Sequence, residues 1–205
     1  MIQKLSLGFK FRYGLADLGI ALITSAMQFF LLYYYTDVAG IDPALAGAAL
    51  MTGKLTWDAI NDPLFGYISD RARSRFGRRR IFMLLGVVPL GLAAWLMFSL
   101  PAGLEGVAAF LAVLLTFWLV DTFHTMVSVP YYALTPELTR DYNERGSLTS
   151  IRMVYSVVGY ILGAALTTIL AGLFQGAGLD LRAAWSATGA VFGAIAILTI
   201  LGTAF

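Results

Sequence analysis

Residues 15–35 read LADLGIALITSAMQFFLLYYY, and no acidic residue follows Asp17 until Asp37. A helix of this length is long enough to cross the roughly 30 Å hydrocarbon core of a bilayer. The basic segment before it, MIQKLSLGFKFRYG, is not followed by the short apolar core and small-residue cleavage site of a secretory signal. We therefore predict that this stretch is the first membrane-spanning helix.

The rest of the chain has the same character. Hydrophobic residues make up 59% of the sequence and charged residues 13%, whereas soluble domains carry about a quarter charged residues. The apolar segments are too long for the roughly 10-residue alternating strands of a membrane barrel. We predict an all-α, polytopic membrane protein in which residues 1–205 form one bundle of six transmembrane helices, at about 13–36, 43–69, 81–100, 104–134, 148–175 and 183–203. The chain has no cysteine, which excludes disulfides and cysteine metal sites.

The charges of the loops predict the orientation of this bundle. One set of alternate loops holds Asp37, Asp42, Glu105, Asp180 and a single basic residue, Arg182. The other set holds eleven basic residues: Lys4, Lys10, Arg12, Arg71, Arg73, Arg75, Arg78, Arg79, Arg80, Arg140 and Arg145. Because basic loops stay in the cytoplasm, we expect both termini there and the protein in the plasma membrane, which in bacteria is the inner membrane.

Several charged residues fall inside the predicted spans, where each costs about 2.5–3.5 kcal/mol even on a mild insertion scale. Their helical spacing places them in stripes, so we expect three helices to turn polar faces toward one central space. The stripes are Tyr13, Asp17, Ala21, Thr24 and Gln28; Lys54, Asp58 and Asp62; and Asp121, His124, Thr125, Ser128 and Tyr132.

Asp58 and Asp62 are the sharpest feature of these stripes. Two carboxylates one helical turn apart, at about 6 Å, repel by roughly 2–3 kcal/mol at an effective dielectric constant near 20. A proton, a lysine or a metal cation would relieve the repulsion. Sodium suits two carboxylates together with neutral oxygens from Asn61 or Thr125. The alternative is a buried ion pair between Lys54 and Asp58, which would leave Asp62 without a partner.

Other intramembrane residues have two interpretations each. His124, the single histidine, is either a proton relay or a hydrogen-bonded interior side chain. Asp17 either lines the cavity or extends outward to pair with Arg12. Asp121 lies near the middle of its span, so it is harder to explain as a residue that extends outward to the membrane surface.

The arginine-rich loop after the second span also has alternatives. Six arginines satisfy the rule that basic loops are cytoplasmic, and they could also bind anionic lipid. A loop this short between two spans is a poor nucleic-acid ligand. The spacing of glycine, aspartate and arginine favours a cytoplasmic gate formed by Gly66, Asp70, Arg71, Gly77, Arg78 and Arg79.

That loop resembles the signature between helices two and three of the major facilitator superfamily. The run WDAINDP at 57–63, followed by Gly66 and Asp70-Arg71, is similar to the glycoside–pentoside–hexuronide:cation symporter family, typified by the melibiose carrier. A second block, VPYYALTPELT at 129–139, agrees, as do Asp141, Glu144-Arg145 and Arg152. The resemblance covers essentially the whole chain.

The resemblance implies a cation-coupled secondary transporter that carries a small solute, such as a sugar or glycoside, by alternating access. Asp58 and Asp62 match the family's cation-binding aspartates, with Asn61 and Thr125 nearby, and the ion is Na⁺ or H⁺. Tyr132 stands where the melibiose carrier has a sugar-stacking tryptophan, and Arg152 lies close to a sugar-site arginine. The two sugar-binding aspartates correspond to Ala21 and Ser128, a departure that leaves galactoside binding unsupported. We therefore assign substrate binding to Asp17, Ala21, Asp121, His124, Ser128, Tyr132 and Arg152.

Major facilitator proteins normally have twelve spans in two halves with the site between them. We therefore expect this chain to be the N-terminal half, which pairs with a C-terminal six-helix half or with a second copy of itself. The alternatives are a symporter of a lipid-like solute and a non-transporting scaffold subunit. We expect no enzyme, because we find no nucleophile set, metal-ligand cluster or phosphate-binding motif in the sequence, and no cofactor beyond the coupling cation. The other expected partners are the solute and the bilayer.

Overall fold

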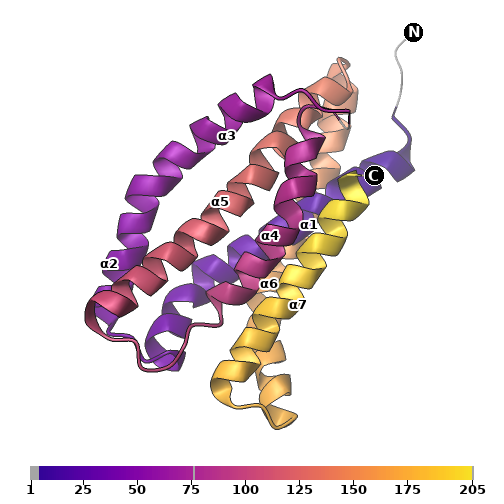
Figure 1. Cartoon of the computed structure of the whole chain (residues 1–205). Coiled ribbons are helices and arrows are strands. Elements are labelled where there is room, and N and C mark those ends of the chain that lie inside the picture. Colours follow the sequence, from indigo (N-terminus) through magenta and orange to yellow (C-terminus); the bar gives the residue numbers. More distant parts are fainter. Residues whose placement is uncertain (1–4, 76, 205) are drawn as a thin grey trace.

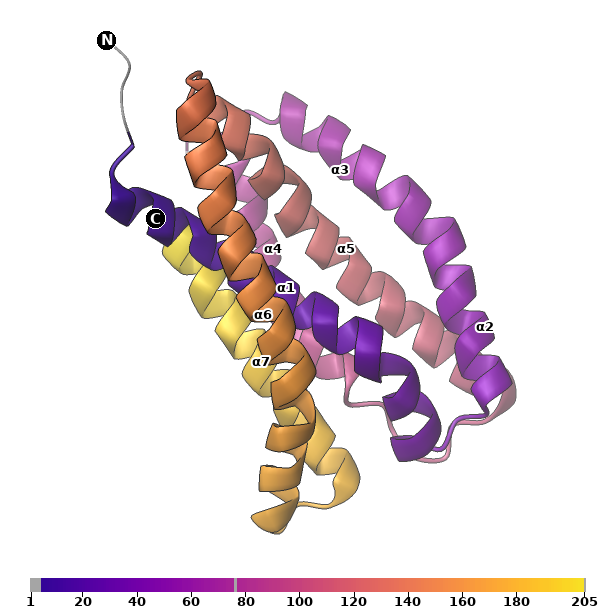
Figure 2. The ribbon, with the colours of Figure 1, turned by 180° about the vertical axis from the view of Figure 1, so that it is seen from behind.

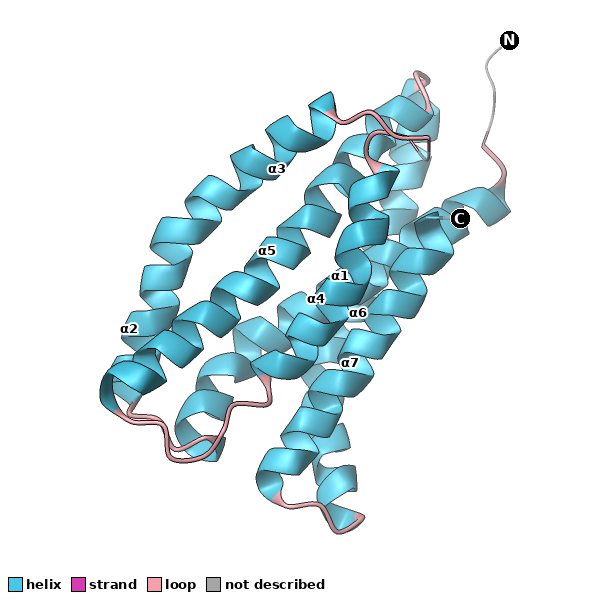
Figure 3. Cartoon of the chain, in the orientation of Figure 1, coloured by secondary structure: helices cyan, strands magenta, loops and turns pink. Residues whose placement is uncertain are grey.

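The computed structural model describes residues 5–75 and 77–204, so Lys4, one of the basic residues used for the orientation, lies outside the described part. All regular structure in this part is helical (Figure 3). The elements are α1 (Leu7–Tyr33), η1 (Tyr34–Val38), α2 (Pro43–Gly53), η2 (Lys54–Asp58), α3 (Ala59–Arg71), α4 (Arg80–Met97), α5 (Gly106–Leu138), α6 (Tyr142–Gly176) and α7 (Leu181–Ala204).

Polar caps set where several of these helices begin. The Ser6 side chain accepts a hydrogen bond from the amide of Phe9, and Asp42 accepts from the amides of Ala44 and Leu45. Asp141 accepts from the amide of Glu144 at 2.8 Å. Such caps satisfy amides that have no partner within the helix. They explain why α1 and α6 begin six residues before the apolar stretches predicted at 13 and 148.

The second span is a single helical run with a wide turn in its middle. Elements α2, η2 and α3 follow one another without a break from Pro43 to Arg71, and η2 is a π-helical turn at Lys54–Asp58. Pro63, inside α3, has no amide hydrogen for the Ala59 carbonyl. Wide turns of this kind are frequent at functional sites, and this one ends at the first of the two paired aspartates.

Five helical segments of the described chain are long and apolar enough to cross a membrane: Leu7–Val38, Arg80–Met97, Gly106–Leu138, Tyr142–Gly176 and Leu181–Thr203. The run from α2 to α3 is not one of them, because its charged residues lower its hydropathy. Its 29 residues still extend over about 40 Å, and it lies alongside α5 (Figure 1). The chain is an all-α, multi-pass membrane protein, and the crossing of the membrane by the run from α2 to α3 stays a prediction.

The helices pack as one continuous series of neighbours. Helix α1 lies against α6 and α7, as the view from behind shows (Figure 2), and α4 lies between α5 and α7. A Cβ atom added at Gly159 or Gly163 of α6 would come closer than 3.0 Å to the backbone of α1. Gly91 of α4 and Gly193 of α7 meet in the same way. Small residues therefore let these helices approach closely, as is common in bilayers.

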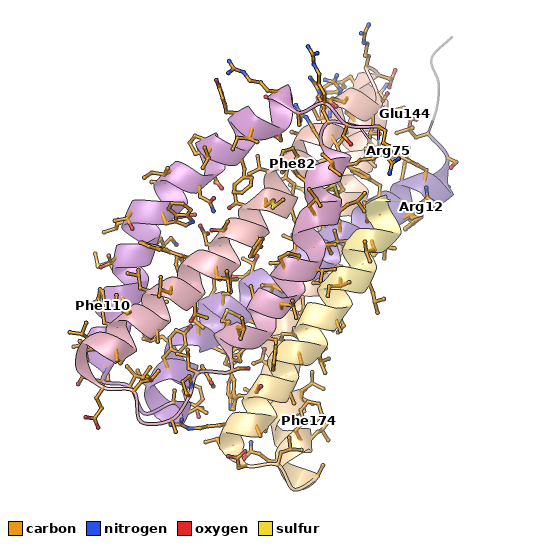
Figure 4. The ribbon with its side chains drawn as sticks, viewed as in Figure 1. Arg12, Arg75, Phe82, Phe110, Glu144 and Phe174 are labelled. Carbon is orange, nitrogen blue, oxygen red and sulfur yellow. The ribbon has the colours of Figure 1, made fainter. Side chains whose placement is uncertain are left out.

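The ends of the bundle differ in charge. Arg12, Arg75 and Glu144 lie toward one end of the molecule, whereas Phe110 and Phe174 lie toward the other (Figure 4). At the first end, the Lys10 ammonium contacts Glu144 Oε2 at 2.9 Å and donates to Ser147 Oγ at 2.9 Å. This ion pair fastens the start of α1 to the start of α6.

Candidate functional site

A cavity of about 510 Å³ lies between α1, the second span and α5. Two of the three predicted polar stripes line it completely: Lys54, Asp58 and Asp62 of the second span, and Asp121, His124, Thr125, Ser128 and Tyr132 of α5. Of the stripe on α1, Thr24 and Gln28 line the cavity, whereas Tyr13, Asp17 and Ala21 do not. Apolar side chains complete the lining: Met27, Leu31, Leu50, Phe117 and Val129.

The two paired aspartates face this cavity from the second span. Asp58 ends the π-helical turn, and Asp62 follows one turn later. The Thr125 hydroxyl on α5 donates a hydrogen bond to Asp62 Oδ1 at 3.0 Å. Thr125 is buried, so its position across from Asp62 is fixed by the packing of α5.

Asn61, which precedes Asp62 in α3, is completely buried and is not among the residues that line the cavity. Its Nδ2 donates to Asp121 Oδ2 at 2.9 Å. Its other polar atom, Oδ1, has no hydrogen-bond partner. A buried acceptor without a partner loses about 1–3 kcal/mol of solvation, so the structure holds an oxygen here that would accept a proton donor or a cation.

Lys54 also lines the cavity, but it does not neutralise the aspartates directly. None of the ion pairs formed by the described residues involves Lys54. The alternative of a permanent Lys54–Asp58 pair is therefore not what the structure adopts.

His124 faces the cavity with one nitrogen engaged. The Thr24 hydroxyl donates to the Ile20 carbonyl at 2.9 Å and lies 3.1 Å from His124 Nε2. The tautomer with a hydrogen on Nε2 fits both contacts, because the single hydroxyl hydrogen is then used on the carbonyl. The Gln28 side chain accepts from the Tyr160 hydroxyl of α6. Ser128 and Tyr132 line the same cavity farther along α5.

Asp17 and Arg152 lie outside the cavity lining and bind each other. Arg152 Nε donates to Asp17 Oδ2 at 2.8 Å, and the Tyr131 hydroxyl donates to the same oxygen at 2.6 Å. Arg152 Nη1 also donates to Thr135 Oγ1 at 2.6 Å. Ala21 is buried one turn after Asp17. In this conformation the three substrate-binding candidates Asp17, Ala21 and Arg152 belong to the contact among α1, α5 and α6.

The predicted gate residues gather at the charged end of the bundle. Arg79 Nη2 contacts Asp70 Oδ1 at 2.7 Å, and its Nε lies 3.2 Å from Glu137 Oε1. Arg78 also pairs with Glu137. Gly77 has a φ of 93°, which glycine adopts readily and which lets the chain turn back before α4. Arg71 instead lies over the Tyr67 ring at 3.7 Å, and Gly66 lies within α3.

Sequence reasoning missed two partners in these clusters. Glu137 joins Arg78 and Arg79 at the end of α5, and Tyr131 joins Asp17. Both residues stand in the block at 129–139. Glu137 is an acidic residue near the end of the fourth predicted span, on the same predicted side as the arginine-rich loop. Its pairing with arginines of that loop could therefore have been predicted from the sequence.

The fold and this cavity define a class: a multi-pass helical membrane protein with acidic groups facing an internal space. The profile of the family described as MFS/sugar transport protein matches residues 12–205. The chain therefore belongs to this family of the major facilitator superfamily, a family of transporters and not of enzymes.

Individual relatives agree with this assignment. The chain is 44% identical over 174 residues to the uncharacterized symporter sll1374 of Synechocystis sp., covering 82% of this chain and 32% of that protein. It is 34% identical over 171 residues to the putative glycoside/cation symporter YagG of Escherichia coli, covering 82% and 36%. It is 35% identical over 175 residues to sodium-dependent lysophosphatidylcholine symporter 1 of Mus musculus, covering 83% and 32%. The chain thus spans about a third of the length of these curated relatives.

Proposed function

We propose that this chain supplies the cation site and one wall of the solute cavity of a cation-coupled symporter. Asp58 and Asp62 bind the coupling ion, Na⁺ or H⁺, with Asn61 and Thr125 as neutral partners. The ion neutralises two carboxylates that otherwise face each other across one turn of a membrane helix. Solute binding and ion binding are then coupled, because both occur at the surface of one cavity.

The observation that carries this proposal is the pair of Asp58 and Asp62 on the cavity wall, where Thr125 donates to Asp62 and no ion pair of the described residues neutralises either carboxylate. Among the residues that the structure describes, no three histidine, cysteine or acidic side chains group as ligands of one metal ion. A site for a tightly held transition metal would need such a group. Two carboxylates with amide and hydroxyl oxygens instead suit a hard cation that must also leave.

We propose a small polar solute, such as a sugar or glycoside, as the cargo. His124, Ser128 and Tyr132 present hydrogen-bonding groups and an aromatic face to the cavity, which suits a hydroxylated ring. A lipid-like solute is the competing cargo, because Met27, Leu31 and Phe117 form an apolar side of the same cavity. Two of the relatives named above carry these two kinds of solute in their names.

The arginine-rich end of the bundle is, in this proposal, the cytoplasmic end. There Arg78, Arg79, Asp70 and Glu137 tie the end of α3 to the end of α5. An ion-pair cluster at this place would hold the cytoplasmic ends of α3 and α5 together beside the cavity.

The test is the double variant Asp58→Asn/Asp62→Asn. We expect NaCl to raise the melting temperature of the purified wild-type protein at fixed ionic strength, with choline chloride as replacement, because a ligand of the folded state stabilises it. The double variant should lose this response. The same variant in the complete transporter should lose uptake driven by a sodium gradient.

The outcomes separate the alternatives. A wild-type protein that responds to neither sodium nor pH would favour a scaffold role. A sodium response that persists in the double variant would place the ion elsewhere and overturn the assignment of Asp58 and Asp62. Competition of uptake by glycosides or by lysolipids decides the class of cargo.

A further inference from the structure

The π-helical turn η2 determines how Asp58 stands relative to Asp62. It covers Lys54–Asp58, and α3 begins directly after it. A turn of this kind places one residue more in the helix than an α-helical turn does. If the turn became regular, Asp58 would rotate relative to Asp62 by one residue position, about 100°. A site that uses both carboxylates therefore depends on what holds this turn in place.

Trp57, inside the turn, is hydrogen-bonded to α5. Its Nε1 donates to Thr122 Oγ1 at 2.8 Å, and an indole N–H can only donate. The Thr122 hydroxyl uses its own hydrogen on the Trp118 carbonyl at 2.6 Å, so its oxygen is left to accept. The Trp57 ring also packs against the Trp118 ring, with centroids 5.7 Å apart and planes at 37°. Helix α5 thus holds the turn through one hydrogen bond and one aromatic contact.

This contact lies at the same level of the bundle as Asp58. The Asp58 carboxyl hydrogen-bonds with the Asp121 carboxyl, and Asp121 directly precedes Thr122 on α5. Asp58 and Asp121 line the cavity, whereas Trp57 and Thr122 are not among the lining residues. Two neighbouring contacts therefore join the turn to α5, one inside the cavity and one outside it.

We propose that Trp57 is a positioning residue: its hydrogen bond to Thr122 holds η2 against α5 and so places the Asp58 carboxylate to bind sodium together with Asp62. This inference rests on the proposed function. Groups that orient metal ligands from outside typically change affinity by about 10–100-fold when they are removed. Because Trp57 acts through the backbone of the turn, we expect the lower end of that range.

The experiment compares two threonine variants of α5. Thr122→Val removes the acceptor of the Trp57 N–H. Thr116→Val is the matched control, because Thr116 likewise donates to the carbonyl four residues before it, that of Ala112. The Kd for sodium comes from the rise of melting temperature with NaCl at fixed ionic strength, and the melting temperature in choline chloride measures stability alone. Thr122→Val should raise the Kd about tenfold, and Thr116→Val should leave it unchanged.

Further variants test the same bond from both sides. Thr122→Ser keeps a hydroxyl that can accept from Trp57 and should retain wild-type sodium affinity. Trp57→Phe removes the donor, keeps an aromatic ring beside Trp118, and takes the place of Thr122→Val if that variant does not fold. The double variant Trp57→Phe/Thr122→Val should lose no more affinity than the weaker-binding single variant, because both changes remove one bond and such effects are not additive.

The outcomes separate positioning from packing. A contact that only holds the helices together would lower the melting temperature in choline chloride and leave the Kd unchanged, which would overturn the inference. Equal effects of Thr122→Val and Thr116→Val, or additive losses in the double variant, would overturn it as well. A wild-type protein without any sodium response would overturn the sodium site itself, and this failure is distinct because it is seen before any variant is compared.

Discussion

Among single residues, Arg152 and Asp17 form a buried ion pair outside the cavity lining, whereas Asp58 and Asp62 face the cavity without an ion pair. Both partners are shielded, with side-chain exposures of 12% and 6%, and Tyr131 completes the contact. Arg152→Leu leaves the Asp17 carboxylate buried without its cation. We expect a loss of about 3–5 kcal/mol of stability, measured by denaturation in detergent with and without sodium. The loss should be the same in both conditions, because neither residue lines the cavity.

The matched control for this variant is Arg140→Leu. Arg140 is an exposed arginine at the same end of the bundle, and surface charges contribute little to stability. Similar small losses in both variants would show that the Asp17–Arg152 pair does not hold α1 to α6. A change confined to solute binding would return Arg152 to the role that the family resemblance implies.

At the scale of elements, α6 offers two glycines with opposite expectations. A Cβ at Gly159 meets the Leu18 backbone of α1, whereas a Cβ at Gly172 meets nothing within 4 Å. Gly159→Ala should therefore destabilise the bundle by about 1–3 kcal/mol through overpacking. Gly172→Ala should be neutral or stabilising by up to about 1 kcal/mol, since alanine favours helix. Melting curves of the two proteins measure both effects, and equal shifts would contradict the close approach of α1 and α6.

The same elements show how far sequence reasoning reaches. Apolar length predicts the helices, and four-residue spacing predicts that the second and fourth spans turn Asp58 and His124 to one cavity. The spacing of polar residues in the sequence does not show which neighbouring helix packs against a given helix face. Helix α6 approaches α1 so closely that Asp17 and Ala21 are buried, while Thr24 remains in the cavity. The π-helical turn that ends at Asp58 also lacks a periodic signal in the sequence.

At the scale of the whole molecule, the remaining expectation is the orientation in the membrane. Eleven basic residues belong to loops predicted on one side, and Arg12 and Arg75 lie toward the same end (Figure 4). The chain has no cysteine, so single cysteines report the side without background. Arg73 and Glu105 are both exposed and lie in loops of opposite sets. We predict that Glu105→Cys reacts with a membrane-impermeant maleimide in right-side-out vesicles, whereas Arg73→Cys reacts only after the membrane is permeabilised.

The cysteine-free parent protein is the control for this labelling, because it must stay unlabelled in both conditions. The physical reason for the prediction is the asymmetry of insertion: basic loops near the spans resist translocation, and acidic loops do not. The opposite pattern would place the Arg79–Glu137 cluster on the outer side, where it would close the other entrance of the cavity. Labelling of both cysteines in sealed vesicles would mean that α4, the helix that lies between the two positions, does not cross the membrane in this chain.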